Sequence, residues 1–440
     1  MNAEAKLDIP AMIAFIDAEF RHQFRNVIDQ ITLPIPQRVD QFTCWPGLSV
    51  VASADNGRRV ELNFRNNPSK LREGEYVYVN AMTVEPKDVI SGPEGVIRKL
   101  DHETKTVVIE PAYQQARRFE RRFRIDDRVV LDQTLPAAHF GRDLPVLALR
   151  ILNGEFGQHP RIKRIRALLE GREGPRASGD RSLFNAGDDS FLSQLTEAQR
   201  EALTAAIEND FALIQGPPGT GKTYILGLLI REFVRRGKSV GVCAFTHQGI
   251  NNVLNECLQY EDIPEVVKLG APGTWNRDPD HPRLNLNPRP AAFFKQKNRP
   301  AVTGFTQHAA FGPLARGLEG AIGDSLQDRF DVLVFDEAGQ LTISAAAMAM
   351  LQADRFVFAG DHQQLPPVVA TVRPGFGPGI SVFRHLVELA KQPSTMLDRS
   401  FRLNDELVSF PSEEFYSGKL QSSASAAGRR LNIQLPDHDA

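Results

Sequence analysis

The stretch that decides the fold of this chain is Gly216-Pro217-Pro218-Gly219-Thr220-Gly221-Lys222-Thr223. It matches G-x-x-x-x-G-K-[ST], a loop whose backbone N–H groups wrap a polyphosphate such as that of ATP. In this pattern Lys222 reaches the β- and γ-phosphates, and the Thr223 hydroxyl holds Mg²⁺. A glycine-rich turn that binds nothing is the alternative, but few ordinary turns need this composition. The sequence therefore predicts a nucleotide-binding site at this loop.

The segments on either side of the loop support this interpretation. Phe211–Gln215 is a short apolar run typical of a buried strand, and Thr223–Val234 has apolar residues at helical spacing. Arg235 and Arg236, followed by Gly237, are typical of the basic last turn and the stop of a helix. A strand, a phosphate loop and a helix in this order predict an α/β fold in which the helix N-terminus faces the anion.

Length and composition set wide bounds. The chain has 440 residues, 42% hydrophobic and 24% charged, as in ordinary globular proteins, and this length suits about two to four domains. The formal net charge is −2, so any nucleic-acid partner must use local basic stripes. The three cysteines form no C-x-x-C pair, and we found neither an apolar stretch of transmembrane length nor a signal peptide. We therefore expect a cytoplasmic protein (nuclear in a eukaryote) with no membrane partner.

Residues 1–190 are expected to form an N-terminal accessory region. Ile9–Ile31 has apolar residues at three- and four-residue steps, which predicts an amphipathic helical stalk. Short alternating runs between about residues 42 and 135 predict a small β-barrel. Residues 145–169 are expected to be helical, and residues 171–190, rich in Gly, Arg, Asp and Ser, to form a linker.

Residues 191–392 alternate strands with helices, which predicts a parallel sheet covered on both faces. The expected strands are Phe211–Gln215, Ser239–Phe245, Ala301–Phe305, Asp331–Phe335 and Arg355–Ala359. Asp278–Pro300 is rich in Asn, Pro, Arg and Asp, so we expect an inserted surface loop there. Near Pro393 a further strand–helix pattern begins, and residues 393–440 are expected to start another domain.

Two carboxylates follow one of the predicted strands and can complete an ATP site. Asp331–Phe335 delivers Asp336 and Glu337 at its carboxyl end, where ligand chemistry gathers in such sheets. Asp336 suits the metal ion, and Glu337 suits the base that orients the attacking water. Two acids that only cap the next helix are the alternative.

Polar residues next to two other elements are further candidates. Gln364 could sense the γ-phosphate, and Asp361 could join the water and metal network; a simple turn closed by prolines is the alternative. Thr196 and Gln199 fit a capping box, which is a purely structural explanation. The Gln199 amide could instead pair with the adenine edge, and the sequence does not decide between the two.

In order along the chain, these residues resemble the superfamily 1 helicases. The similarity is to the branch with the up-frameshift RNA-surveillance helicase, senataxin and the immunoglobulin-mu-binding helicase. It covers about residues 192–420, and its most specific signatures are D-E-A-x-Q and G-D-x-x-Q-L-P-P. The matching segments are Gln199, Gly216–Thr223, Ala244–Asn252, Thr303–Thr306, Asp336–Gln340, Gly360–Pro367 and Arg399–Arg402.

The resemblance implies a fold and an activity. It implies a P-loop NTPase with a RecA-like parallel sheet over residues 191–392, preceded by a helical stalk and a barrel. The implied activity is hydrolysis of ATP with Mg²⁺, coupled to movement along single-stranded RNA or DNA, with 5′-to-3′ polarity. A nucleotide-dependent nucleic-acid-binding or regulatory module that unwinds nothing is the alternative.

The resemblance also implies roles for single residues. Thr246, with the neighbouring His247, and Thr306 would contact nucleic-acid phosphates. Phe401 would stack on adenine, and Arg402 would act as the arginine finger on the transferring phosphoryl group. A surface ion pair is the alternative for Arg402.

In the resembling family two RecA-like domains close on ATP. Residues 393–440 would supply only the start of the second, so we expect a truncated, split or partial motor. A second polypeptide could supply the missing half.

Two clusters of basic residues leave two interpretations open. Each could bind nucleic-acid phosphates, with an affinity that falls steeply with salt, or could be a solvated face paired with nearby acids. The clusters are Arg117, Arg118, Arg121, Arg122 and Arg124, and Arg161, Lys163, Arg164 and Arg166.

Overall fold

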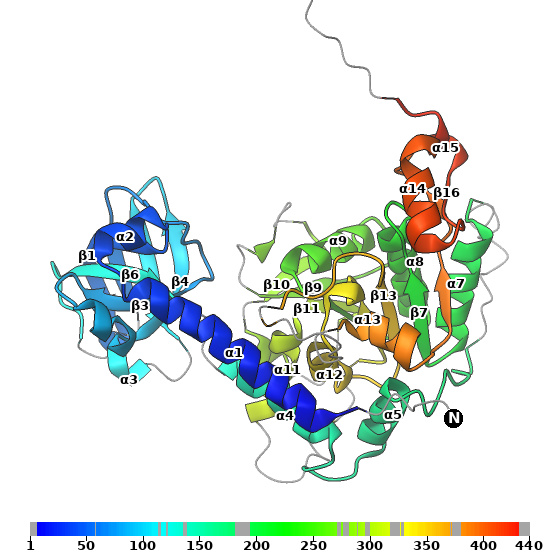
Figure 1. Cartoon of the computed structure of the whole chain (residues 1–440), viewed down its shortest axis with the longest axis horizontal. Coiled ribbons are helices and arrows are strands. Elements are labelled where there is room, and N and C mark those ends of the chain that lie inside the picture. Colours follow the sequence, from blue (N-terminus) through cyan, green and yellow to red (C-terminus); the bar gives the residue numbers. More distant parts are fainter. Residues whose placement is uncertain are drawn as a thin grey trace, which may run out of the picture. The chain divides into compact units, whose positions relative to one another are not determined.

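The computed structural model of this chain contains two compact units (Figure 1). It describes residues 7–57, 59–112, 116–119, 122–134, 139–180, 194–270, 274–275, 281–287, 289–294, 300–316, 326, 330–369, 371 and 380–430. One unit comprises Met1–Ala11, Leu147–Val368 and Pro374–Ala440, and the other comprises Met12–Val146 with Val369–Arg373. Among the described residues, no helix combines the length and the apolarity needed to span a bilayer.

The smaller unit is built on a closed β-barrel, as the sequence predicts. Its strands pair antiparallel in the order β1-β2-β5-β4-β3-β6. The bounds are β1 Cys44–Ala54, β2 Arg59–Asn63, β3 Tyr76–Ala81, β4 Glu94–Asp101, β5 Thr106–Pro111 and β6 Arg128–Gln133.

Alternation along the strands explains the barrel core. One side chain in two points inward, so Val60 and Leu62 of β2, with Val107 and Ile109 of β5, enclose a buried cluster with Trp45. Phe119 of helix α3 (Ala116–Phe119) and Phe123 join this cluster, their rings 5.5 Å apart. These two phenylalanines therefore belong to the core, although they do not lie on a strand.

Helices α1 and α2 precede the barrel strands in the chain. Helix α1 spans Ile9–Ile31, the predicted bounds, and its last residue packs with Tyr78 and Val89. Helix α2 (Ile35–Asp40) carries Arg38, which is fully buried and bonded to Asp132 of β6.

The larger unit contains an eight-stranded parallel sheet, which confirms the predicted α/β fold. The strand order is β10-β9-β11-β8-β12-β13-β7-β14. The five predicted strands are present as β7 (Phe211–Gln215), β8 (Val240–Cys243), β11 (Val302–Phe305), β12 (Val332–Phe335) and β13 (Phe356–Gly360). The others are β9 (Val266–Leu269), β10 (Leu284–Asn287) and β14 (Ser394–Met396).

Helices cover both faces of this sheet (Figure 1). On one face, α7 (Glu197–Glu208), α8 (Lys222–Arg235) and α9 (His247–Cys257) bury small and β-branched residues such as Ile214, Val242 and Val334. The alternate residues of the strands are aromatic, and the rings of Phe335 and Phe358 stack 4.3 Å apart. Helix α12 (Ile343–Met350), which packs on α11 (Gln307–Arg316), is buried along its whole length.

Two expectations about the edges of the sheet were wrong. Asp278–Pro300 is not a loop throughout, because it contains β10, paired with β9, and α10 (Pro290–Phe293). Residues 393–440 were expected to start another domain, but their first strand, β14, hydrogen-bonds in parallel to β7 of this sheet. After β14, the short strands β15 (Arg399–Ser400) and β16 (Gln421–Ser422) pair with each other beside α14 (Asp405–Tyr416).

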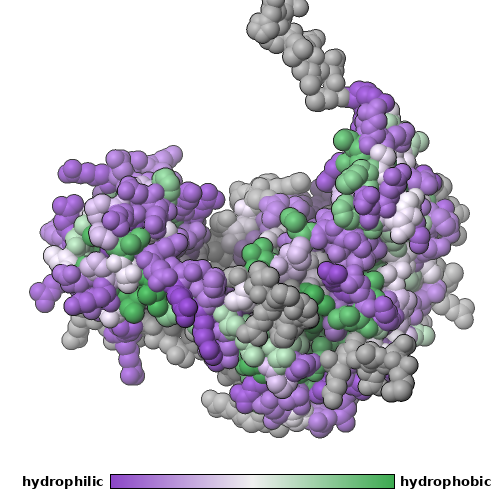
Figure 2. Space-filling view, viewed as in Figure 1, coloured by the Kyte–Doolittle hydropathy of each residue, from purple (hydrophilic) through white to green (hydrophobic). Residues whose placement is uncertain are grey.

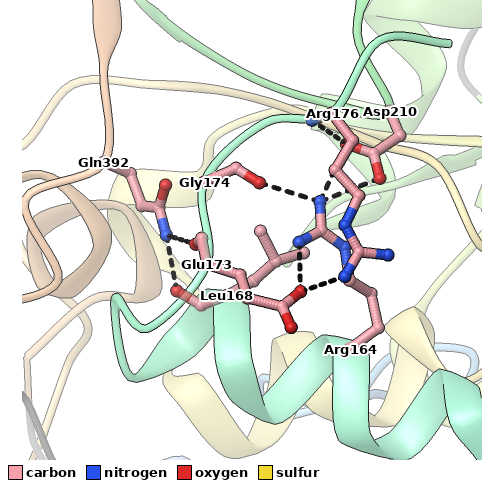
Figure 3. A network of polar contacts seen from close by, with 7 residues as sticks. All are labelled: Arg164, Leu168, Glu173, Gly174, Arg176, Asp210 and Gln392. Atoms are coloured by element: carbon pink, nitrogen blue, oxygen red, sulfur yellow. Dashed lines mark hydrogen bonds and ion pairs between the residues drawn. The ribbon is translucent and has the colours of Figure 1, made fainter.

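Three arginines of the second basic cluster pair with acids, and Figure 3 shows the network around one of them, Arg164. Arg164, on α5 (Pro160–Leu169), bonds both carboxylate oxygens of Asp210, at 2.9 and 2.8 Å, and Glu173 at 2.8 Å. Gln392 donates to the Leu168 and Glu173 carbonyls at 2.8 and 2.7 Å. Arg161 pairs with Asp354 and Arg166 with Glu170. These three arginines therefore pair with nearby acids, as one of the two interpretations left open by the sequence expects.

The first half of the predicted linker is fixed by the same network. Residues 171–180 have little regular structure, but Ala177 bridges to Asn209, and Asp180 pairs with Arg355 at 2.7 Å. The other half, residues 181–190, lies outside the described residues, as does Arg121 of the first basic cluster.

Candidate functional site

The loop Gly216–Thr223 lies between β7 and α8, as its sequence predicts. Gly221 caps α8 with φ 79°, and Gly219 has φ 77°. A Cβ added to Gly219 would lie 2.4 Å from Cβ of Arg402, so glycine is needed both for the dihedral angle and for this close approach. The backbone N–H of Phe401 donates to the Gly219 carbonyl at 2.7 Å. The segment after β14 is therefore bonded directly to the phosphate loop.

Lys222 meets the two predicted carboxylates beneath the loop. Its Nζ lies 3.0 Å from Glu337 Oε1 and 3.7 Å from Asp336 Oδ1. Burial acts to lower the pKa of Lys222, but the two carboxylates outweigh it and leave that pKa raised. Burial also raises the pKa of Asp336, against the lowering effect of Lys222. The structure thus brings together three of the residues that the sequence predicts for an ATP site.

The backbone around these carboxylates is unusual. Glu337 has φ 52° and ψ 38°, the left-handed region that a residue with a side chain rarely adopts. Gly339 packs so closely on the next strand end that an added Cβ would lie 2.5 Å from the Asp361 carbonyl oxygen. Strained conformations of this kind cluster at functional sites, where the surrounding packing holds them.

Asp361 is the centre of a hydrogen-bond network beside the loop. It accepts bonds from Gln215 Nε2 at 3.1 Å, from Gln364 Nε2 at 2.9 Å and from the Tyr416 hydroxyl at 2.7 Å. Burial and this bond to Asp361 raise the pKa of Tyr416. The sequence analysis missed Gln215 and Tyr416; the signal for Gln215 was a glutamine that ends an apolar strand.

Gln199 makes the capping box that its sequence context predicts. Its Oε1 accepts from the Thr196 N–H at 3.0 Å, and the Thr196 hydroxyl accepts from the Gln199 N–H at 3.2 Å. The amide nitrogen donates to the Thr220 carbonyl at 3.2 Å. The side chain therefore joins α7 to the phosphate loop, and one amide proton is left for another acceptor.

A cavity of about 540 Å³ opens over the loop. Beyond Gly216–Thr223, it is lined by Tyr224, Asn252, Glu256, Glu337, Gln364, Phe401 and Arg402. Phe401 is 37% exposed, so its ring face is accessible. Among the described residues, no acidic side chain pairs with Arg402. The sequence analysis missed Tyr224, Asn252 and Glu256, because only the packing of α9 beside α8 brings the last two to the loop.

The predicted nucleic-acid contacts lie outside this cavity. Thr246 is the N-cap of α9, accepting from the Gly249 N–H at 3.1 Å, and Thr306 accepts from the Ala309 N–H at 3.4 Å before α11. These residues follow β8 and β11, which are neighbours in the sheet. Two helix N-termini, each a favourable position for an anion, therefore start from adjacent strands. His247 opens α9, and its Nδ1 lies 2.9 Å from Lys268 Nζ.

The donor set at the loop fits magnesium. Mg²⁺ is usually held by one or two protein oxygens together with phosphate oxygens and waters. Thr223 is the second residue of α8, and Asp336 lies beside Lys222, so a hydroxyl and a carboxylate are available next to the loop.

Comparison with known proteins is consistent with this geometry. Residues 194–435 match a family model described as an AAA domain, so the chain belongs to that family. It is 27% identical over 251 residues to the DNA replication ATP-dependent helicase/nuclease DNA2 of Xenopus laevis, covering 56% of this chain and 23% of that protein. It is 28% identical over 292 residues to a Regulator of nonsense transcripts 1 homolog of Drosophila melanogaster, covering 59% and 24%. These matches are consistent with the resemblance of the sequence to the superfamily 1 helicases.

Another relative matches over more of its own length. The DNA polymerase alpha-associated DNA helicase A of Schizosaccharomyces pombe is 28% identical over 308 residues, covering 60% of this chain and 45% of that protein. The chain thus spans less than half of the length of each of these three relatives. Among solved structures, arterivirus nonstructural protein 10 (helicase) aligns with a TM-score of 0.38 and 11% identity, covering 87% of this chain and 62% of that one. That likeness is too distant to bear on the site.

Proposed function

We propose that this chain is the ATP-hydrolysing part of a motor that moves along single-stranded nucleic acid. The observation that carries the proposal is the cluster of Lys222, Asp336 and Glu337 beneath the phosphate loop. Its relatives are helicases by name, which supports the same class of activity.

The proposed ATP site divides its tasks among these residues. The loop N–H groups and Lys222 hold the phosphates, and Thr223 and Asp336 hold Mg²⁺, which neutralises charge on the phosphates when bound. Glu337 then exchanges its contact with Lys222 for the attacking water. Gln364, held by Asp361, lies where it can report on the γ-phosphate, and Arg402 faces the same cavity.

The base of the nucleotide has two candidate partners. Phe401 offers an exposed ring for stacking, and Gln199 offers its remaining amide proton. Both residues belong to segments that are hydrogen-bonded to the loop. Nucleotide binding can therefore change the positions of α7 and of the segment after β14.

We infer that the motor belongs to the branch with the D-E-A-x-Q signature, with 5′-to-3′ movement. The sequence Asp336–Gln340 and the likeness to a Regulator of nonsense transcripts 1 homolog support this branch. Its nucleic acid would lie across the N-termini of α9 and α11, with contacts from Thr246, His247 and Thr306.

We further propose that a second motor half completes the ATP cleft. Helix α14 exposes three large apolar side chains, Leu407 by 63%, Phe410 by 66% and Phe415 by 47%. Figure 2 shows hydrophobic atoms gathered on this segment. An apolar face of this kind beside an ATP cavity fits a second motor half, supplied by more chain or by a second polypeptide.

The test is an ATPase assay with and without single-stranded DNA or RNA. We expect ATP turnover that depends on Lys222 and is stimulated by single-stranded DNA or by single-stranded RNA. Lys222→Ala should abolish it, and Lys87→Ala, at an exposed lysine of the other unit, should not. Turnover that survives Lys222→Ala would refute the proposed site. Stimulated turnover with no ATP-dependent strand separation would favour the nucleotide-dependent binding module.

A further inference from the structure

Lys268 is a buried lysine that the ATP site does not use. It lies on β9 and is 1% exposed. Its Nζ lies 2.9 Å from His247 Nδ1 and 3.3 Å from Thr274 Oγ1. The cluster of Lys268, His247 and Thr274 therefore gathers at the first turn of α9, behind the exposed N-cap Thr246.

No carboxylate among the described residues pairs with this ammonium group. Across the sheet Lys268 is in register with Leu286 of β10 and Gly304 of β11, neither of which can be charged. Cys243, which ends β8, is fully buried, and burial raises the pKa of its thiol. Glu337, near Gly249 of α9, is already paired with Lys222. Burial lowers the pKa of Lys268 to about 8.

The contact with Lys268 determines the tautomer of His247. A protonated lysine can only donate hydrogen bonds, so Nδ1 must accept, and the proton of a neutral imidazole must then be on Nε2. Burial and the charge of Lys268 lower the pKa of His247 to about 4, so the ring is neutral at physiological pH. Among the described residues, Nε2 has no hydrogen-bond partner, and His247 is partly exposed.

We propose that Lys268 is a positioning residue for nucleic-acid binding, which holds His247 as a neutral Nε2–H donor to one backbone phosphate. The inference rests on the proposed function and assigns the chemistry of one contact in it. The positive charge lies behind the imidazole, not at the protein surface. The neutral Nε2–H of His247 donates to the phosphate, and the Lys268 ammonium group lies behind the imidazole ring. The Thr246 hydroxyl and the N-terminus of α9 lie next to this donor.

The surroundings favour a phosphate group over other ligands. Two helix N-termini, at Thr246 and Thr306, start from adjacent strands of the same sheet. Each helix start carries the partial positive charge of the helix dipole. The buried ammonium group of Lys268, which has no acidic partner among the described residues, adds a full charge. A phosphodiester backbone is an anion that can contact both helix N-termini along one strand.

The first test measures the tautomer and the protonation of the His247 imidazole in the protein without nucleic acid. We would label histidine with ¹⁵N, assign His247 by its loss in His247→Gln, and titrate from pH 7.5 to 5.5. The expected spectrum shows a neutral Nε2–H ring that does not titrate. In Lys268→Met the pKa of His247 should rise toward its ordinary value, and in Lys268→Arg it should stay low. An Nδ1–H ring in the wild type, or one that titrates near pH 6.5, would overturn the proposal.

The second test reads binding of a fluorescein-labelled 20-nucleotide single strand by anisotropy at pH 7.5. We expect Lys268→Met to weaken binding by roughly tenfold, as for loss of a hydrogen bond assisted by charge. Lys268→Arg should keep most of the affinity, and His247→Gln, with a neutral donor, should lose less than Lys268→Met. Wild-type affinity should also fall as the pH rises from 7.5 to 9.5, while that of Lys268→Arg stays level. Equal affinity of Lys268→Met and wild type would contradict the proposal.

The two tests separate this inference from the proposed function. A wild type that binds no single strand under any of these conditions would refute the proposed function, whatever the ¹⁵N spectrum shows. Binding that is normal in Lys268→Met, in a protein whose ATPase responds to nucleic acid, would refute only the role of Lys268. A cooperative thermal unfolding transition in each variant establishes that it folds.

Discussion

Two buried lysines in the same parallel-sheet unit, Lys222 and Lys268, have opposite electrostatic surroundings. Lys222 opens α8 beside Asp336 and Glu337, and their charges leave its pKa raised. Lys268 lies on β9 beside a histidine and a threonine, and burial lowers its pKa to about 8. The same residue type thus shifts in either direction, because the partner, not the burial, sets the sign. Each arrangement suits a different anion. At Lys222 the phosphates of a nucleotide replace the carboxylate of an ion pair, and at Lys268 a nucleic-acid phosphate supplies the negative charge that the described residues lack.

The largest expected effect concerns the acid that pairs with Lys222. If Glu337 activates water and is more than a partner of the lysine, Glu337→Gln should lower kcat by about 10²- to 10³-fold, within the range of general-base catalysis. The affinity for an ATP analogue should change little, because the phosphates are held by the loop and Lys222. Single-turnover kinetics and equilibrium binding measure the two quantities. Equal losses in both would mean that Glu337 serves binding only.

The next largest effect is the loss of folding stability when the ion-paired Lys222 is replaced. Lys222→Met leaves Asp336 fully buried without its cation, so we expect the free energy of unfolding to fall by about 2 kcal/mol in the absence of nucleotide. This is less than for a fully buried pair, since the Glu337 side chain is 38% exposed. Denaturant unfolding at pH 7 measures it. No loss of stability would show that the pair contributes nothing to folding.

Substitution of Lys268 should change stability in the opposite direction to substitution of Lys222. The pKa of Lys268 is lower in the folded chain, about 8, than in the unfolded chain, where it takes the ordinary lysine value of 10.5. Its charge therefore opposes folding below pH 8, and this cost disappears as the pH rises to 10.5. Lys268→Met should be more stable than the wild type by about 1–2 kcal/mol at pH 7, after its lost hydrogen bonds are subtracted.

Denaturant unfolding at several pH values checks this prediction. The advantage of Lys268→Met should shrink between pH 8 and 10. A variant that is less stable than the wild type at pH 7 would show that Lys268 is stabilised by groups other than His247 and Thr274.

The smallest effect concerns Gln199, whose amide serves a helix cap and can also serve a ligand. Gln199→Ala should lower stability by about 1 kcal/mol, as for loss of a cap, and should also reduce the preference for ATP over GTP. Thr196→Ala is the matched control, because it removes the other half of the cap and leaves the amide. Equal nucleotide preference in the two variants would leave Gln199 with a structural role alone.

Local patterns predicted much of the fold. The five strands next to the ATP motifs were found because their apolar runs end in polar or glycine-rich turns. β9 and β10 were not predicted, and β14 was not assigned to this sheet. These short strands lie at or next to the edges of the sheet, where their order depends on pairing with distant strands and their own sequences carry little signal. The basic cluster around Arg164 could not be assigned from sequence, because its acid Asp210 lies far along the chain.

The sequence by itself determined the phosphate loop, the two carboxylates after β12 and the order of the motifs, because each is a short stretch whose chemistry is local. Only the tertiary structure decided which charges meet. It placed Glu337 on Lys222, Tyr416 on Asp361 and His247 on Lys268, each pair brought together by packing across the sheet edge. Whether the pKa of a buried ionisable group is raised or lowered depends on such neighbours, and these neighbours are distant in the chain.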